Sequence, residues 1–429
     1  MKKANYLGPL RSGQRVVIIG GGPGGAGCAI ALKNLCRKRN IDLHVVIYEG
    51  KVFKGERQFN QCAGVLSPPI KQIMEELIDV SFPENLVQKN ITGYMLHSDV
   101  NRIFLDGSKD PSYALRRIKF DEYLLEKAVD LGVEVITGRV VDLEFCPDKV
   151  MVYSECNNYR ADVVVGAFGL DDGTAKIFER HTDYRQPQFL TSIITKIHPG
   201  MDFLREFGNI IHAFLPSYRE IEFGAITPKE NHLTLNIAGK DITADSMERF
   251  LDYTPVKAIL PPHFLELRKD LSFYKGKFPI STARGIYGDR YVTIGDASGL
   301  IRPFKGKGVN AGILTGLRAA RTMIQHGISR EDFKYYYESC REVIKDLPYG
   351  RILRQLANKS ANLGVLPSII QFAERDDSLR EALFNCVSAH KTFKKIYEET
   401  RSLELAFRLI GIVGGSILKR DENLLNKAR

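Results

Sequence analysis

The pattern of apolar positions near the start of the chain predicts a strand, a helix and a second strand. Val16–Ile19 form a continuous apolar run, which is typical of a buried parallel strand. Apolar residues at helical spacing follow, and a second apolar run, LHVVIYE, ends at Glu49. The first 49 residues are therefore expected to form one β–α–β unit.

The turn between the first strand and the helix has the form GxGxxG, with glycines at Gly20, Gly22 and Gly25. Gly20 permits a tight turn, Gly22 lets the backbone approach a pyrophosphate, and Gly25 lets the helix pack close to the strand. Pro23 belongs to the same loop, and Glu49 can accept hydrogen bonds from ribose hydroxyls. Strand, GxGxxG, helix, strand and acid together predict a dinucleotide site at the helix N-terminus, without distinguishing NAD from FAD.

A second glycine-rich segment, far along the chain, extends this prediction. A buried strand over Tyr291–Ile294 leads to Asp296, then to a loop with Gly306 and Gly308, then to a helix starting near Val309. Asp296 could bind a ribityl hydroxyl, and the bare loop would let the backbone pass a flat ring. The helix N-terminus, with Lys305 and Lys307 nearby, would stabilise negative charge on a reduced flavin. A cofactor that uses both sites is FAD, because NAD needs only the first.

The segment between the two sites has a different pattern. FLTSIITKI, IHAFL, EIEFGAI and HLTLNIAG are short alternating runs, which predict an antiparallel sheet that covers the flavin and shapes an apolar pocket. The expected fold is α/β: a Rossmann-type FAD-binding domain with an inserted antiparallel substrate sheet and a helical C-terminal region. The boundaries are 1–174 and 281–328 for the FAD-binding domain, 175–280 for the sheet and 329–429 for the helices. His212, His232 and Tyr218 in the sheet segment are interpreted as structural residues rather than proton donors.

Composition limits the partners and the location. The net charge of +10 is spread along the chain and accompanies no nucleic-acid-binding motif. The seven cysteines include no CxxC pair, and metal-site spacings are missing. No apolar run is long enough to span a bilayer, and the N-terminus has no secretory apolar region, so a cytoplasmic protein is expected. Residues 402–420, apolar with basic flanks, are either a core helix or an interfacial helix on anionic lipid, which would make the protein peripheral on the membrane.

Several segments resemble a known family. GGGPGG with Glu49, and GDASG followed by PFKGKG, resemble the FAD-binding motifs of the p-hydroxybenzoate-hydroxylase-type fold. RQFNQCAGVLSP and RRIKFDEYLLEKAVDLGVEV resemble segments of geranylgeranyl reductases. The resemblance implies that further residues contact FAD. Cys62, Ala63 and Val65 would border the cofactor, and Arg117 would touch it. Val141 would contact the adenine through its backbone, and Gly308 and Val309 would meet the flavin ring.

The resemblance also implies a reaction. It indicates an FAD-dependent oxidoreductase in which hydride passes from reduced flavin to a C=C bond of an isoprenoid-like or other apolar substrate, with NAD(P)H or ferredoxin as electron donor. Two alternatives stay open: a flavin monooxygenase for an aromatic or polyketide substrate, and an electron-relay flavoprotein. Phe168-Gly169 stands where hydroxylases of this fold commonly have Asp-Gly, and the chain has no tryptophan, which halogenases of this fold carry in a signature motif. No catalytic side chain is identified, since the cofactor carries the chemistry in such enzymes.

Overall fold

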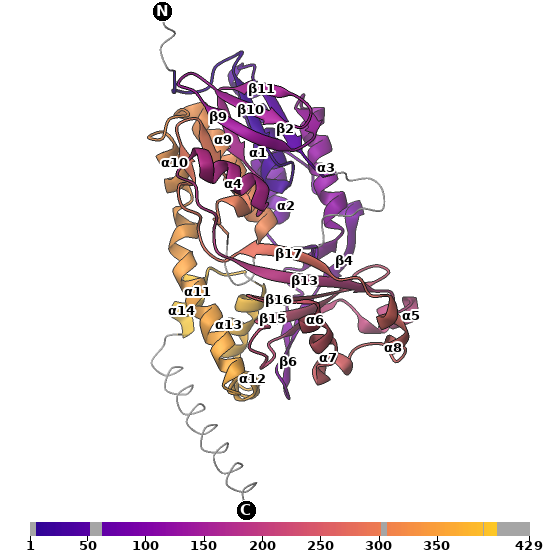
Figure 1. The fold of residues 1–429 in the computed structure, drawn as a ribbon. Helices are drawn as coiled ribbons and strands as arrows, with labels where there is room; N and C mark the ends of the chain where they lie inside the picture. Colours follow the sequence, from indigo (N-terminus) through magenta and orange to yellow (C-terminus); the bar gives the residue numbers. More distant parts are fainter. Residues whose placement is uncertain (1–5, 52–61, 302–306, 389, 401–429) are drawn as a thin grey trace, which may run out of the picture. The chain divides into compact units, whose positions relative to one another are not determined.

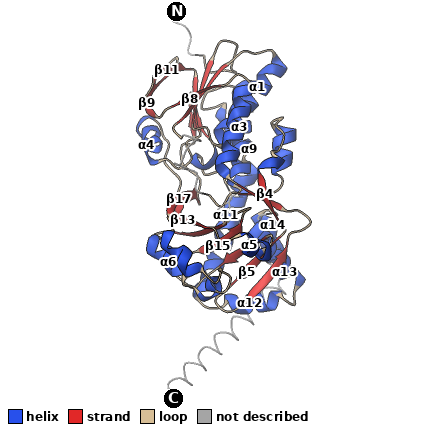
Figure 2. Ribbon diagram, turned by 90° about the vertical axis from the view of Figure 1, so that its right-hand side faces the viewer, coloured by secondary structure: helices blue, strands red, loops and turns tan. Residues whose placement is uncertain are grey.

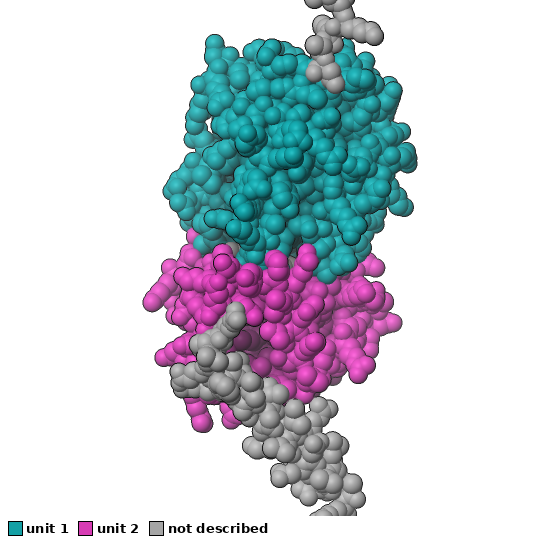
Figure 3. Space-filling model, turned by 90° about the vertical axis from the view of Figure 1, so that its left-hand side faces the viewer, with its two compact units in different colours: residues 1–87, 115–189, 277–347 teal, residues 88–114, 190–276, 348–429 magenta. Residues whose placement is uncertain are grey.

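The computed structural model describes residues 6–51, 62–301, 307–388 and 390–400. The chain divides into two compact units (Figure 3), each described by itself below. Unit 1 contains residues 1–87, 115–189 and 277–347, and unit 2 contains residues 88–114, 190–276 and 348–429. Three segments of chain thus contribute to each unit.

Unit 1 is built on a six-stranded sheet in the order β18-β19-β12-β1-β2-β8 (Figure 1). Five of the strands are parallel, and the short β18 is antiparallel to β19. The strands are β1 (Arg15–Ile19), β2 (His44–Glu49), β8 (Glu134–Thr137), β12 (Val163–Gly166), β18 (Tyr287–Gly288) and β19 (Tyr291–Thr293). The predicted β–α–β unit is confirmed.

One face of this sheet is covered by a smaller antiparallel sheet and a helix. Val17, Val46 and Val164 form a buried cluster with Leu143 and Phe178. The small sheet has the order β11-β10-β9, and the helix is α4, which Asp171 caps by accepting a hydrogen bond from the Thr174 backbone N–H. The elements are β9 (Val140–Phe145), β10 (Val150–Ser154), β11 (Asn158–Ala161) and α4 (Asp172–His181).

Three helices of unit 1 pack together, and α1 contacts both α3 and α9. Their bounds are α1 (Pro23–Arg39), α3 (Arg117–Asp130) and α9 (Gly308–Gln325). The shorter α10 (Phe333–Ser339) packs on α9. The remaining short elements of the unit are β3 (Val65–Leu66), α2 (Ile70–Gln72), η1 (Ile73–Leu77), η2 (Glu84–Leu86) and η4 (Gly295–Ala297).

Unit 2 contains a seven-stranded sheet in the order β17-β13-β16-β15-β14-β5-β6 (Figure 2). From β13 to β14 the neighbouring strands are antiparallel, as are β5 and β6, whereas β14 and β5 run parallel. The bounds are β5 (Gly93–His97), β6 (Arg102–Asp106), β13 (Phe189–Ile197), β14 (Ile210–Phe214), β15 (Phe223–Pro228), β16 (Leu233–Gly239) and β17 (Tyr274–Pro279). The four predicted alternating segments are β13 to β16.

Residues 93–106 supply two further strands of this sheet, although the sequence boundaries placed them in the first FAD-binding segment. Strand β5 joins β14, which lies more than a hundred residues later, with Ile211 opposite Tyr94. Short alternating segments do not show which sheet they enter, because pairing depends on distant partners. The local sequence pattern therefore did not show that residues 93–106 belong to unit 2.

Helices cover one face of the seven-stranded sheet. Phe250 of α6 and Val256 of α7 pack in a buried cluster with Phe214, Ile226 and Leu235 of the strands. The helices are α5 (Met201–Phe207), α6 (Ala244–Leu251), α7 (Thr254–Lys257), α8 (Phe264–Leu267) and η3 (Arg268–Asp270). Two further strands of the chain are β4 (Val87–Ile91) and β7 (Ser112–Leu115). The C-terminal region continues with α11 (Arg341–Asn362), α12 (Leu366–Ala373), α13 (Asp377–Ser388) and α14 (Phe393–Thr400).

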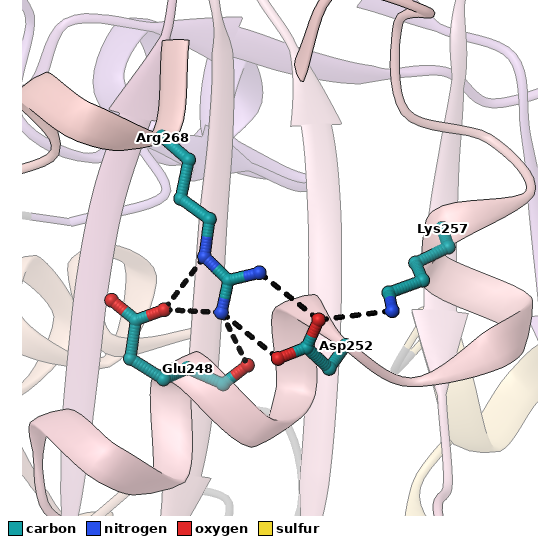
Figure 4. Close-up of polar contacts among 4 residues, drawn as sticks. All are labelled: Glu248, Asp252, Lys257 and Arg268. Carbon is teal, nitrogen blue, oxygen red and sulfur yellow. Dashed lines mark hydrogen bonds and ion pairs between the residues drawn. The ribbon is translucent and has the colours of Figure 1, made fainter. Parts of the chain in front are cut away.

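A charged network fastens the helices of that face to one another (Figure 4). The Arg268 guanidinium donates to Glu248 Oε2 from Nε at 2.9 Å and to Asp252 Oδ1 from Nη1 at 3.0 Å. Lys257 Nζ lies 3.0 Å from the same Asp252 oxygen. One arginine therefore ties η3 to α6 through two carboxylates.

None of the helices in the described ranges combines the length and the apolar character that crossing a lipid bilayer requires.

Candidate functional site

The N-terminus of α1 is shaped by two glycines that have no room for a side chain. Gly20 has φ +108°, and a Cβ there would lie 2.4 Å from the Ala167 carbonyl oxygen. A Cβ on Gly25 would lie 1.9 Å from the Gly20 carbonyl oxygen. Both distances are impossible for a real side chain, so these glycines make the turn and the close helix–strand contact that the GxGxxG pattern predicts.

Gly22, between them, is in a different situation. It is the N-cap residue of α1, and a Cβ built there would meet nothing within 4 Å. Pro23 follows at the start of the helix, and the first turn carries no acidic side chain. Open space in front of a helix N-terminus suits an anionic group, because the first backbone N–H groups of a helix have no intrahelical partner. The residues present fit a pyrophosphate at this position.

Glu49 is held in place at the end of β2. Its side chain is buried, and it accepts hydrogen bonds from the Gly21 backbone N–H at 2.8 Å and from the Lys51 backbone N–H at 2.7 Å. A carboxylate offers about four acceptor positions, so two remain for hydroxyl donors. The position and the capacity both suit the predicted role on a ribose.

Arg117, the first residue of α3, is oriented by a buried carboxylate one turn later. Its Nε and Nη2 donate to the two oxygens of Asp121 at 3.1 and 3.2 Å, and Asp121 is 2% exposed. Burial lowers the pKa of the guanidinium, but the paired carboxylate of Asp121 outweighs that effect and raises it, and Asp296 acts in the same direction. Asp296, a predicted site residue from a distant part of the sequence, thus acts electrostatically on Arg117.

Asp296 lies on η4, next to the N-terminus of α9. A Cβ on Gly308, the first residue of α9, would be 3.7 Å from Asp296 Oδ1, an ordinary contact distance. Burial raises the pKa of the Asp296 carboxyl, and the charges of Arg117 and Lys51 oppose the rise. Among the described residues, a Cβ on Gly308 would meet no other atom within 4 Å, so Asp296 and the helix N-terminus border the same space.

The remaining predicted site residues are distributed around this region of unit 1. Cys62 is exposed, and its sulfur accepts a hydrogen bond from the Gly64 backbone N–H at 3.4 Å. Ala63 and Val65 are half-buried, and Val309 is buried. Gly306 and Lys305 lie outside the described residues, as do residues 401–429.

Val141 is the additional residue of a β-bulge. The pairing of β9 with β10 steps from Asp142 opposite Tyr153 to Val140 opposite Ser154. The Val141 side chain is 51% exposed. A bulge residue is left out of the ladder, which suits the predicted contact through its backbone.

Lys307, which the sequence predicted to lie near the reduced flavin, contacts a backbone carbonyl of a distant segment. It is the N-cap residue of α9, half-buried, and its Nζ donates to the Pro68 carbonyl oxygen at 2.5 Å. Nearby, the Asn310 amide donates to the Ser67 carbonyl oxygen at 3.1 Å. Lys307 and Asn310 therefore anchor the start of α9 to the segment that follows Cys62.

The sequence interpretation missed two glycines of α9. A Cβ on Gly316 would lie 2.6 Å from the Gly24 carbonyl oxygen, and one on Gly312 would lie 3.2 Å from the Gly24 nitrogen. On the α1 side, a Cβ on Gly27 would lie 3.2 Å from Ile313 Cα. These glycines allow α1 and α9 to cross in close contact. The four-residue spacing of Gly312 and Gly316 on an apolar helix was the available signal.

The polar residues considered in the sheet segment lie in unit 2. His212 Nδ1 is 2.9 Å from His97 Nε2, and the two buried rings stack with each other. His232 contacts the side chain of Asn231, and the Tyr218 ring packs against Tyr253. Each of the three side chains thus has a contact within unit 2, as expected for a structural residue.

The comparisons with known proteins agree with the sequence motifs. No protein-family model matches the chain. The digeranylgeranylglycerophospholipid reductase of Methanococcus aeolicus is 22% identical over 295 residues, which cover 63% of this chain and 72% of that protein. A geranylgeranyl bacteriochlorophyll reductase-like protein from Thermoplasma acidophilum has a similar structure, with a TM-score of 0.64 and 17% identity over 90% of this chain and 98% of that one.

The fold is also shared with halogenating enzymes. The flavin-dependent brominase Bmp2 has a TM-score of 0.62 and 18% identity, over 95% of this chain and 99% of that one. The α/β fold that the sequence predicted is thereby confirmed. The chain is similar to geranylgeranyl reductase-like FAD-dependent oxidoreductases, which are enzymes.

Proposed function

We propose that this protein is an FAD-dependent reductase that saturates C=C bonds of an isoprenoid-like, apolar lipid substrate. The observation that carries the proposal is the similarity to a digeranylgeranylglycerophospholipid reductase over most of both chains. The open position at Gly22 and the orientation of Arg117 by Asp121 support it. When bound, FAD would supply the hydride that such a reduction needs.

The residues of unit 1 would hold that cofactor at several points. The N-terminus of α1 would face the pyrophosphate at Gly22 and Pro23, and Glu49 would accept the ribose hydroxyls. Val141 would meet the adenine through its backbone. These roles would fix the nucleotide half of FAD against backbone groups that cannot move independently.

The other half of the cofactor would lie near the start of α9. Asp296 would bind a ribityl hydroxyl, and Arg117 would touch the cofactor in the orientation that Asp121 gives it. Gly306, Gly308 and Val309 would border the ring, together with Cys62, Ala63 and Val65. A helix N-terminus at this point would favour negative charge on the reduced ring.

The cofactor arrangement can be tested by two glycine substitutions. A Cβ at Gly22 or Gly308 would meet no atom of the described residues closer than 3.7 Å, so Gly22→Ala and Gly308→Ala should leave the apoprotein as stable as the wild type. Each should nevertheless weaken FAD binding, because the added methyl group occupies cofactor space. Titration of FAD into the apoproteins measures this, with thermal unfolding of the apoprotein as control. Unchanged affinity in both variants would contradict the placement.

The reaction needs a separate experiment. The purified holoprotein would be reduced anaerobically with NADH, NADPH or reduced ferredoxin, and an unsaturated geranylgeranyl glycerophospholipid would then be added. Reoxidation of the flavin together with a lipid product enriched in hydrogen supports the proposal. Reoxidation only by a quinone or a partner protein, without an organic product, would instead indicate an electron relay.

A flavin monooxygenase is the other candidate reaction. It would consume NADPH and oxygen together when its aromatic or polyketide substrate is present, and it would leave the geranylgeranyl lipid unchanged. Phe168, in place of the acidic residue common in hydroxylases of this fold, packs against Phe178 and Tyr184. Its apolar surroundings support the reductase over the monooxygenase.

A further inference from the structure

Strand β6 (Arg102–Asp106) lies at one end of the seven-stranded sheet of unit 2 (Figure 1). Within the described ranges it pairs with β5 alone, in a continuous antiparallel register without a bulge. Its side chains alternate along RIFLD, with exposed residues at Arg102, Phe104 and Asp106 and buried residues between them. The exposed face and the outer edge of this strand are therefore available to another strand.

The outer edge of β6 carries the backbone groups of the three exposed residues. At one end of the β5–β6 pair, the Gly107 N–H donates to the Thr92 carbonyl oxygen at 2.9 Å. Hydrogen-bonded and non-hydrogen-bonded pairs alternate along an antiparallel ladder, so Ile103 and Leu105 are the β6 residues that bond to β5. The N–H and C=O groups of the residues between and beside them point away from the sheet.

The exposed side chains of β6 are arranged symmetrically about its central residue. Phe104 is 46% exposed, and Arg102 and Asp106, two residues before and after it, carry opposite charges. Edge strands that avoid self-association commonly carry lysine, proline or a bulge, and β6 has none of these. In an antiparallel pair of two such strands, the charges would attract rather than repel each other.

We propose that β6 pairs with β6 of a second copy of this chain, antiparallel and centred on Phe104. In this register Phe104 lies opposite itself, and Arg102 of each copy lies opposite Asp106 of the other, on the same face of the sheet. All three facing pairs are of the hydrogen-bonded type, so they use the backbone groups that point away from β5. The contact is isologous, and it therefore closes into a two-fold dimer.

The dimer should be weak and reversible. The five residues of β6 are fewer than the about 20–30 residues that each partner contributes to a standard stable interface. A second copy is still favoured over an unrelated strand, because the sequence of β6 supplies both the charged pairs and the aromatic pair to itself. Self-association should therefore depend on concentration and reach an end point at two copies.

Sedimentation velocity on the full-length protein, from micromolar to millimolar concentration, measures this dimer. Arg102→Glu leaves two acidic residues on the edge and Asp106→Lys leaves two basic ones, so each variant alone should dimerise about tenfold or more weakly than wild type. An equimolar mixture of the two variants should form a heterodimer as strong as the wild-type dimer, because every facing charged pair is again of opposite sign. Arg205→Glu, at a 74% exposed side chain of α5 in the same unit, should leave self-association unchanged.

A cysteine at the centre of the strand tests the register separately. Opposite residues of a hydrogen-bonded antiparallel pair have Cα atoms about 5.5 Å apart, which is within the range of a disulfide. Mild oxidation of Phe104→Cys should link the two introduced cysteines to each other, as mass spectrometry of the joined peptides would show. Leu265→Cys, at a 73% exposed side chain of α8, should give no such link.

Three results would overturn the proposal. A wild-type protein that stays monomeric at millimolar concentration would show that β6 does not pair with itself. Self-association that both charge variants retain, or that their mixture does not restore, would assign the contact to another surface. A dimer of Phe104→Cys that forms without the disulfide at this position would exclude the register centred on Phe104.

Discussion

Replacing Gly316 with alanine places a methyl group where α1 and α9 cross. The new Cβ would lie 2.6 Å from the Gly24 carbonyl oxygen and 2.9 Å from the Cys28 nitrogen. Both neighbours are backbone atoms, so neither can rotate away. Ordinary carbon contacts need about 3.5 Å, so the two helix backbones must separate by nearly 1 Å.

The cost of this separation can be set against the gain in helix propensity. Overpacking in a dense interior costs about 1–3 kcal/mol, and alanine regains up to about 1 kcal/mol over glycine inside a helix. We expect Gly316→Ala to destabilise the apoprotein by about 1–2 kcal/mol net. Urea unfolding measures this, and hydrogen exchange in peptides from α1 and α9 assigns the loss to the crossing.

The matched control is Gly308→Ala on the same helix. Within the described part of the chain its Cβ would meet Asp296 Oδ1 alone, at 3.7 Å, so no backbone movement is required there. The expected order of apoprotein stability is Gly316→Ala below wild type and Gly308→Ala equal to wild type. If Gly316→Ala is as stable as wild type, the crossing is not tightly packed and the reasoning fails.

Three further predictions follow from single contacts. Burial, followed by the charge of His212, lowers the pKa of His97 to about 3, and burial lowers that of His212 to about 4, against an ordinary value of 6.5; the unfolded chain thus takes up protons first, and stability should be complete above pH 6.5 and decrease from there towards pH 4. Between pH 7.5 and pH 5, the free energy of unfolding measured with urea should decrease less for His212→Gln than for wild type. Equal decreases in the two proteins would exclude this histidine pair as the cause. Arg268→Ala should destabilise unit 2 by about 1–2 kcal/mol, with solvent exposure of its partners limiting the effect, and Arg268→Lys should recover only part of the loss in thermal unfolding, whereas full recovery would rule out the two-carboxylate geometry as the cause. Bound FAD should slow the reaction of the exposed Cys62 with a thiol reagent but not that of Cys146, and mass spectrometry of the labelled peptides would reveal a wrong placement if both react equally with and without FAD.

The sequence predicted those parts of the site that depend on local backbone geometry. The roles of Gly20 and Gly25 follow from a turn within six residues, and their positions agree with the pattern. The four alternating segments could be recognised as strands for the same reason. Asp121 was not singled out, because a buried carboxylate one turn after Arg117 looks like any surface ion pair until burial is known.

Long-range contacts were the part that local patterns could not supply. The pairing of β5 with β14 depends on register between segments more than a hundred residues apart. The contact of Lys307 could not be predicted locally, because its acceptor, the Pro68 carbonyl oxygen, is 239 positions away. A glycine that serves a cofactor and a glycine that serves a helix crossing also look alike in sequence, and only the surroundings of a built Cβ separate Gly308 from Gly316.

The helix crossing at Gly316 links the two halves of the proposed FAD site. The helices whose N-termini would face the cofactor, α1 and α9, are the same two that cross through glycines. A Cβ on Gly312 would lie 3.2 Å from the Gly24 nitrogen, so the contact begins two residues after Gly22 and four after Gly308. A displacement at the crossing must therefore shift the pyrophosphate end and the ring end of the site together. Gly316→Ala, which touches no cofactor atom in this arrangement, should for that reason weaken FAD binding in proportion to its loss of stability, whereas Gly308→Ala should weaken binding without any loss of stability.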